Sequence, residues 1–410
     1  MRRFFAFSII FAFAALILAL SWQVSGFSDL YVKYVFPLLA INYGRLAAMA
    51  PISVGEILLY VFVFLGALTV FFFVLGILCI FFGKRKPLWF AVLFGRVFLD
   101  ICVVVFLIQV LNCFVLYHTT PLYGEGSGEY TPTKEELVEF REVLVGRAND
   151  LALTFERNDK GEIVYNGDMA ATAKKAMNNL GEIGTYSFSS DAIPKVLGRL
   201  SRLKGFYSTP KPLWLSDFFS QQYIKGYFFP FSMEANYNNV MYIANLPDTM
   251  CHELAHTKGF IYEDEASFIA YLACMNSGDP FFEYSATLNA LDYVNEEIYK
   301  EIERDSALYD RITKKNDLVI RDCVFLTDEA WNKVEKDALL DTDTVSKASE
   351  TFLDTNLTVN GVEDGIVSYS RMVNLLLRYH SELMPAGTGS LSGAGDEAED
   401  TGADTGASDN

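Results

Sequence analysis

The sequence predicts an α-helical membrane anchor of three transmembrane helices, followed by a mostly α, α+β domain with a small sheet. Three long apolar stretches lie within residues 1–117, and each reaches the roughly 20 residues that a helix needs to cross the hydrocarbon core. The same segment holds eight of the 33 Lys and Arg residues, but only three of the 51 Asp and Glu residues. This partition is typical of a membrane part joined to an acidic soluble part.

The three predicted spans cover about residues 4–22, 57–82 and 88–117. The first could instead be a signal peptide, because it follows Arg2 and Arg3 and precedes polar residues. Its apolar run is longer than that of a signal peptide, and no A-x-A cleavage site follows it. An uncleaved span is therefore favoured, and the lipid bilayer is an expected partner.

Basic residues predict the orientation of the spans. Arg2 and Arg3 precede the first span, and residues 84–86, all basic, separate the second span from the third. Because Lys and Arg are retained on the cytoplasmic side, the N-terminus should be cytoplasmic, in a multi-pass protein of the plasma membrane. Everything after His118, including the candidate catalytic residues, is then extracytoplasmic. An acidic domain without a basic stripe excludes nucleic acid as a partner.

The part of the chain outside the membrane divides into three segments. Residues 118–131 form a polar, glycine-containing linker, residues 132–384 form the extracytoplasmic domain, and residues 385–410 form an acidic tail expected to be disordered. Aromatic residues broken by Gly and Pro over residues 206–248 predict short strands and turns. From Thr249 onward, apolar residues recur at three and four positions, which predicts helices.

One short motif indicates a metal site. His252 and His256 flank Glu253 in the sequence HELAH, and on a helix both imidazoles share one face and can bind one metal ion. Glu253 then lies where it can take a proton from a water molecule. Asp248 is expected to cap this helix and Gly259 to end it. The alternative is an amphipathic helix with two surface histidines.

A catalytic zinc site needs a third protein ligand and an open position, and the acids that follow the motif are the candidates. Glu263, Ala266 and Ala270 share one face of the next predicted helix, and the two alanines permit close packing on the motif helix. Glu265 points roughly 200° away from Glu263 around the helix axis. It is the alternative ligand, or it orients a metal-binding histidine through a hydrogen bond. Asp264 is the least favoured of the three.

These residues also carry a family resemblance. HELAHTKGFIYEDEASFIAYLAC, preceded by three spans, resembles the domain-of-unknown-function 3810 family of bacterial membrane proteins. APISVGEILLY before the second span and SYSRMVNLLL near the end extend the likeness. The resemblance implies a zincin-like metallopeptidase domain with Zn²⁺ as cofactor. Glu263 and Ala266 are also similar to the E-x-x-A motif of ImmA/IrrE-type and prenyl-protease-type metallopeptidases, in which this Glu binds zinc.

Substrate contacts are predicted less directly. Glu234 and Asn236 lie in an extended stretch before the motif helix; as an edge strand it would pair with a peptide and turn both side chains into the cleft. The alternative is ordinary sheet with surface polar residues. Hydrolysis also needs a donor to the developing oxyanion, for which Tyr262, Tyr369 and Arg371 are candidates.

The expected function is therefore a membrane-anchored zinc-dependent metallopeptidase that hydrolyses peptide or protein substrates outside the cytoplasm. The alternative is a zinc-binding sensor or binding protein of the cell surface without turnover. A channel or transporter is disfavoured, because the sequence offers only three spans. No feature of the sequence indicates an oligomeric state.

Overall fold

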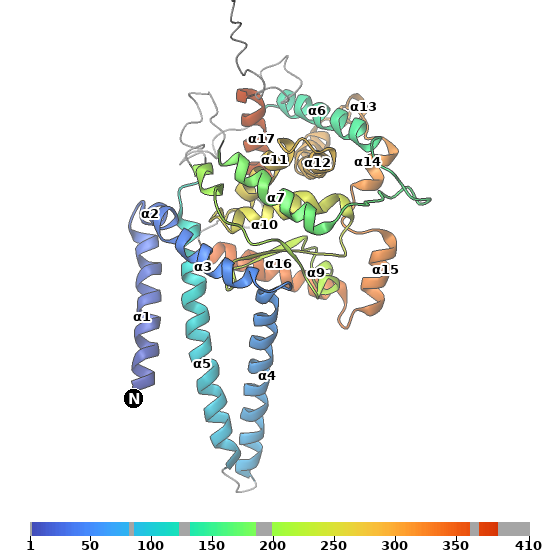
Figure 1. Ribbon diagram of the computed structural model, residues 1–410. Helices are drawn as coiled ribbons and strands as arrows, with labels where there is room; N and C mark the ends of the chain where they lie inside the picture. The colour runs from blue at the N-terminus through green and yellow to red at the C-terminus, as the bar shows by residue number, and fades with distance from the viewer. Residues whose placement is uncertain (1, 82–85, 123–131, 186–198, 361–368, 384–410) are drawn as a thin grey trace, which may run out of the picture.

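Three long apolar helices carry a mostly helical body on their outer ends in the computed structural model (Figure 1). The structure describes residues 2–81, 86–122, 132–185, 199–360 and 369–383. Helices α1 (Arg2–Gln23), α4 (Val54–Phe81) and α5 (Lys86–Asn112) are long and apolar enough to cross a membrane. Their presence confirms the three predicted hydrophobic helices. The predicted tail, residues 385–410, lies outside the described residues.

Two short helices connect α1 to α4 at the base of the helical body. They are α2 (Phe27–Tyr34) and α3 (Phe36–Ala48), and Figure 1 shows both at the outer ends of the long helices. A 3-10 turn, η1 (Phe114–His118), continues the chain beyond α5. Val32 and Phe36 are almost fully buried against Val115 and Leu116 of this turn. The ends of α1 and α5 nearest the body therefore form a packed platform with α2 and η1.

The predicted small sheet has three strands. They are β1 (Lys211–Pro212), β2 (Gly226–Phe229) and β3 (Glu234–Tyr237), in the order β1-β3-β2. β1 runs parallel to β3, and β2 pairs with β3 in antiparallel register. Because β3 is the middle strand, β1 and β2 are the edge strands of this sheet.

Helix α10 (Leu246–His256) lies at the centre of the body, with helices packed around it and the sheet against it. Met250, Cys251 and Leu254 of α10 are fully buried in the main core, and burying a side chain such as Leu254 contributes ~1.5–3 kcal/mol. The other helices and turns are α6 (Lys134–Ala152), α7 (Met169–Ile183), η3 (Ser201–Leu203), α9 (Ser216–Ser220), η4 (Ile243–Asn245), α11 (Glu263–Met275), α12 (Pro280–Arg304), α13 (Leu308–Arg311), α14 (Asp317–Asp322), α15 (Asp328–Asp337), α16 (Thr342–Val359) and α17 (Tyr369–Leu383). Because the apolar side chains of α10 are buried in this core, the helix is a rigid support for the polar side chains that it carries.

The start of α10 differs from the prediction. Asp248 was expected to cap the helix, but it lies inside the first turn, and Asn245 occupies the N-cap position. The reason is Pro247, which lacks a backbone N–H and is suited to the first turn of a helix. Gly259 ends the helical segment as predicted, with a φ of 83° that favours glycine.

A buried ion pair joins the sheet to the start of α4 and the end of α3. Lys211 pairs with Glu234, and Glu234 also accepts hydrogen bonds from the backbone N–H groups of Val54 and Gly55 at the start of α4. The Lys211 ammonium donates to the carbonyl oxygen of Ala47 at the end of α3, at 2.7 Å. The negative charge of Glu234 lies at the positive N-terminal end of α4, and the positive charge of Lys211 lies at the negative C-terminal end of α3. Removing one member of such a buried pair costs ~3–5 kcal/mol.

Two further sets of hydrogen bonds fix the body on α4 and α5. Glu56, which is fully buried in α4, accepts hydrogen bonds from the backbone N–H groups of Trp214 and Leu215, each at 2.8 Å. At the outer end of α5, the Asn112 amide donates to the carbonyl oxygen of Pro230 at 2.7 Å. The orientation of the body relative to α4 and α5 is therefore set by buried hydrogen bonds, which are costly to break.

Candidate metal centre

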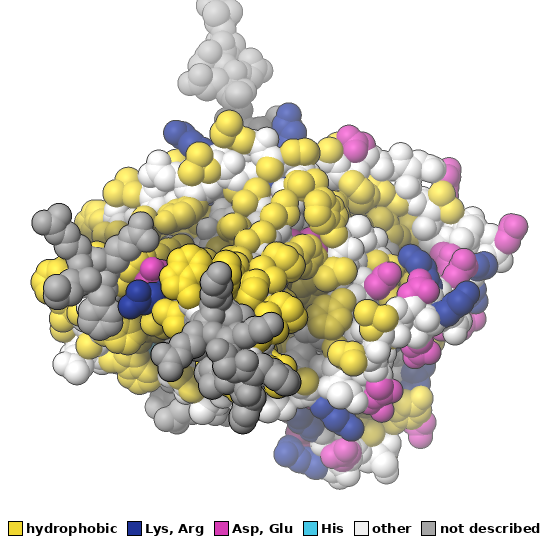
Figure 2. Space-filling model, turned by 90° about the horizontal axis from the view of Figure 1, so that it is seen from below, with side chains coloured by type: hydrophobic (Ala, Val, Ile, Leu, Met, Phe, Trp, Pro, Cys, Tyr) yellow, Lys and Arg dark blue, Asp and Glu magenta, His cyan; other side chains and the backbone are white. Residues whose placement is uncertain are grey.

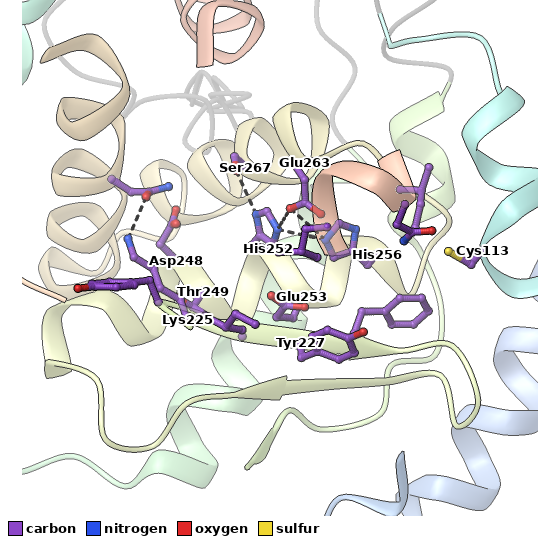
Figure 3. A pocket seen from close by; sticks show the side chains of 18 of the residues that line it. Cys113, Lys225, Tyr227, Asp248, Thr249, His252, Glu253, His256, Glu263 and Ser267 are labelled. Carbon is purple, nitrogen blue, oxygen red and sulfur yellow. Dashed lines mark hydrogen bonds and ion pairs between the residues drawn. The ribbon is translucent and has the colours of Figure 1, made fainter. Parts of the chain in front are cut away.

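Helices α10 and α11 bring three predicted side chains together. His252 and His256 lie one turn apart on α10, with their ring centroids 4.8 Å apart. After the turn at Gly259, α11 packs on α10 and places Glu263 in its first turn opposite both rings (Figure 3). Ala266, one turn further along α11, is fully buried, as expected of a residue that permits close packing.

The three donor atoms converge on one point. His252 Nε2 is 3.1 Å from His256 Nε2 and 3.0 Å from Glu263 Oε2, and His256 Nε2 is 3.7 Å from the same carboxylate oxygen. Ligands about 2.0 Å from a tetrahedral zinc ion lie about 3.3 Å from one another. The spacing and the N, N, O donor set therefore fit a zinc ion with one position left for another ligand.

The other nitrogen of each imidazole is also fixed. His256 Nδ1 lies 2.7 Å from the carbonyl oxygen of Phe260, to which it can only donate. His252 Nδ1 lies 3.1 Å from the hydroxyl of Ser267, which is in turn 3.1 Å from the Tyr293 hydroxyl. Such partners set the tautomer of a metal-binding histidine. In both rings, Nε2 is left facing the other donors.

The charges of the cluster are coupled. Burial alone would lower the pKa of His256, but Glu263 outweighs it and raises the pKa to about 9. Removal from bulk water would raise the pKa of Glu263, yet the two histidines hold it well below its usual range. Burial lowers the pKa of His252. Glu263 is thus a carboxylate, as a zinc ligand must be.

Glu253 lies beside the cluster with its carboxylate in the same cavity. Among the described residues, no group is hydrogen-bonded to this carboxylate. Burial raises the pKa of Glu253 to about 8, and a cation bound by the neighbouring donors would lower it toward the range in which a carboxylate accepts a proton at neutral pH. Gly226 of β2 makes room for it, because a Cβ at position 226 would lie 2.6 Å from both Cγ and Oε1 of Glu253.

The cluster opens into a cavity of about 470 Å³. Its walls come from α5 and η1, from β2, and from helices α10, α11, α12 and α16. The lining residues include Gln109, Cys113, Tyr117, Lys225, Gly226, Tyr227, Phe228, Pro230, Asp248, Thr249, Ile261, Ser267, Asn289, Asp292, Tyr293, Leu353 and Asn356. Burial raises the pKa of Tyr227 to about 12, so its hydroxyl keeps its proton at neutral pH. A space of this size falls within the range of about 300–1,000 Å³ that is usual for ligand-binding pockets.

Comparison with protein families adds one finding. Residues 31–377 match the family model described as a protein of unknown function, DUF3810. The chain belongs to this family. The match runs from α2 into α17 and so includes His252, His256 and Glu263, the sheet and two of the three long helices. No curated protein and no solved structure matches the chain.

Glu265 faces away from the cluster of His252, His256 and Glu263, as helical geometry predicts. Its side chain is buried and accepts a hydrogen bond from the backbone N–H of Leu122. Tyr262, the residue before α11, donates its hydroxyl to the carbonyl oxygen of Tyr117 at 2.6 Å. Neither Glu265 nor Tyr262 is among the residues that line the cavity.

The remaining predicted contacts lie elsewhere. Glu234 and Asn236 do not face the cleft: Glu234 belongs to the ion pair with Lys211, and the Asn236 amide donates to the carbonyl oxygen of Tyr227. This corrects the predicted edge strand, because both residues lie on the middle strand. Arg371 pairs with Asp264 at 3.0 Å outside the cavity. Tyr369 is the first residue of α17, and its side chain lies outside the described residues.

Several cavity residues were not predicted from the sequence. Ser267 follows Glu263 by four residues, so the i, i+4 spacing of α11 could have indicated it. Tyr293 lies 26 residues beyond Ser267, on α12, and no local pattern links the two. Lys225 and Gly226 precede the buried part of β2, and only the tertiary structure brings them to α10.

Proposed function

We propose that this protein is a membrane-anchored zinc-dependent peptidase whose centre is formed by His252, His256 and Glu263, with Glu253 as the acid–base residue. The observation that carries the proposal is the position of Glu253. Its carboxylate has no hydrogen-bonded partner among the described residues, and it lies in the cavity toward which the three donor atoms converge. A structural metal site is closed by a fourth protein ligand, whereas a catalytic site keeps one position open.

The chemistry divides between a metal ion and the residues of this chain. When bound by the three donors, zinc supplies a Lewis acid that lets a water molecule lose its proton near neutral pH. Glu253 accepts that proton as the water oxygen attacks the peptide carbonyl carbon. Glu253 then gives the proton to the amine nitrogen when the C–N bond breaks.

Strand β2 is the element best placed to hold the peptide. It is an edge strand of the described sheet, and Gly226, Tyr227 and Phe228 line the cavity. An extended peptide can add to such an edge through main-chain hydrogen bonds, which bind without regard to side-chain sequence. Gly226 brings the backbone of β2 close to Glu253 and would place the bound peptide beside the acid–base residue.

Metal removal tests the proposal. The purified full chain should contain about one zinc ion per molecule and should cleave a mixture of randomised peptides. A chelator should abolish cleavage, and added Zn²⁺ should restore it. Zinc bound at full stoichiometry without any cleavage would favour the sensor alternative, and absence of zinc would contradict both functions.

We also propose that the body lies outside the cytoplasm, on the basis of the basic clusters at Arg2, Arg3 and residues 84–86. A cysteine introduced after Gly387 should react with a membrane-impermeant thiol reagent in intact cells. A cysteine in place of Lys84 should react only after lysis. Mass spectrometry identifies the labelled position, and the reverse pattern would overturn this orientation.

A further inference from the structure

One wall of the cavity belongs to a membrane helix. Gln109 and Cys113 lie four residues apart toward the outer end of α5, and Tyr117 follows in η1. A span that begins at Trp89 leaves the hydrocarbon core after about 20 residues, close to Gln109. The cavity therefore begins at the level where the hydrocarbon core gives way to lipid headgroups.

Helices α1 and α4 place the boundary between the hydrocarbon core and the lipid headgroups at the same height. Trp22 lies at the outer end of α1 with 53% of its surface exposed, as expected of an aromatic residue at a membrane interface. Leu59 of α4 packs against a small cluster formed by Leu213, Phe219 and Phe229 of the body. The body thus begins where the spans leave the hydrocarbon core.

The underside of the body is rich in exposed apolar side chains. In Figure 1, α3, α9 and α16 lie along the lower edge of the body, next to the outer ends of α4 and α5. Seen from below in Figure 2, hydrophobic side chains gather around the spans, whereas most charged side chains lie toward one edge. Each of these three helices has exposed apolar residues, for example Leu46 of α3, Phe218 of α9 and Phe352 of α16. This surface is continuous with the spans and matches the lipid interface.

The cavity itself changes character along its length. At the α5 end it is lined mainly by apolar and aromatic side chains: Cys113, Tyr117, Phe228, Pro230 and Ile261. At the opposite end it is lined by Lys225, Asp248, Asn289 and Asp292. Figure 3 shows the metal cluster and Glu253 between Cys113 on one side and Lys225 with Asp248 on the other. A bound chain would therefore be apolar near α5 and polar at the end that lies away from α5.

We infer that the substrate is a polypeptide segment directly adjoining its own membrane anchor, which enters the cavity from the membrane surface. This inference rests on the proposed peptidase function and names its substrate class. Apolar residues next to the anchor occupy the α5 end, and the following polar residues extend toward Lys225. The buried contacts of Glu234 and Glu56 hold the body at a fixed height, so a peptide bond far from the bilayer is out of reach.

The test uses the full chain reconstituted in vesicles of phosphatidylethanolamine and phosphatidylglycerol. The probe is a randomised peptide segment fused directly to a single transmembrane helix, with the helix at either end in two versions. A second probe carries a flexible Gly/Ser spacer that holds the same segment more than ~50 Å from the bilayer. A third is the soluble segment alone. The first two probes share the same concentration in the membrane, so their comparison isolates distance from the bilayer.

We expect the directly fused probe to be cleaved about tenfold or more faster than the spacer probe, at bonds next to the anchor. Equal rates for these two probes, or faster cleavage of the soluble segment, would overturn the inference and leave the peptidase function intact. Failure of the zinc-loaded protein to cleave any of the three would overturn the peptidase function and the inference with it.

Discussion

Replacing Glu253 by glutamine is expected to reduce peptide hydrolysis by about 10²–10⁴-fold, because the amide can neither accept nor deliver a proton. Zinc content should stay unchanged, since Glu253 is not one of the three converging donors. Initial rates on a peptide substrate, measured beside metal content by mass spectrometry, give both values. A Glu253→Gln protein as active as the parent would mean that another group moves the proton.

A second variant tests the position of Glu253 rather than its chemistry. In Gly226→Ala, the new Cβ would fall 2.6 Å from Glu253 Cγ, so the side chain must shift and turnover should fall while zinc is retained. Gly181→Ala on α7 is the matched control, because a Cβ there meets nothing within 4 Å. Activity that is unaffected by Gly226→Ala would show that the reaction does not depend on this placement of the carboxylate.

The sequence predicted those parts of the site that depend on one helix or on two successive helices. His252 and His256 share a face because they are four residues apart, and Glu263 reaches them because Gly259 turns the chain directly into α11. Both relations are local, so helical geometry alone defines them. The three long apolar helices were predictable for a similar reason, because length and apolar composition are properties of a single stretch of sequence.

The parts that were wrong depend on strand order and long-range contacts. Glu234 lies just before the motif helix in the sequence, but pairing with both β1 and β2 places β3 in the middle of the sheet. Its carboxylate meets Lys211 and the start of α4, 179 residues away in the chain at Gly55. Periodicity cannot reveal such a contact, nor the wall that α5 contributes to the cavity. The walls of the cavity are therefore less predictable than the three converging side chains.

The other large effect is expected on zinc binding, when Glu263 rather than Glu265 of α11 is replaced. Glu263→Ala is expected to lose tight zinc binding, since it removes one of three donor atoms at the converging point. The loss should exceed the ~10–100-fold that follows from removing a residue that only orients a ligand. With 53% of its side chain exposed, Glu263 contributes little to the packed core. The variant should therefore remain folded.

Glu265→Gln is the matched control on the opposite face of α11. Burial, with Asp264 nearby, raises the pKa of Glu265 to about 8, so at neutral pH this group is largely a neutral acid and glutamine resembles it. The amide oxygen can still accept the hydrogen bond from the backbone N–H of Leu122. Zinc titration of both purified variants, with thermal unfolding as the check on folding, decides between the two residues. If the Glu265 variant is the one without zinc and the Glu263 variant retains it, the ligand set is His252, His256 and Glu265, and the convergence of donors described above is not the metal site.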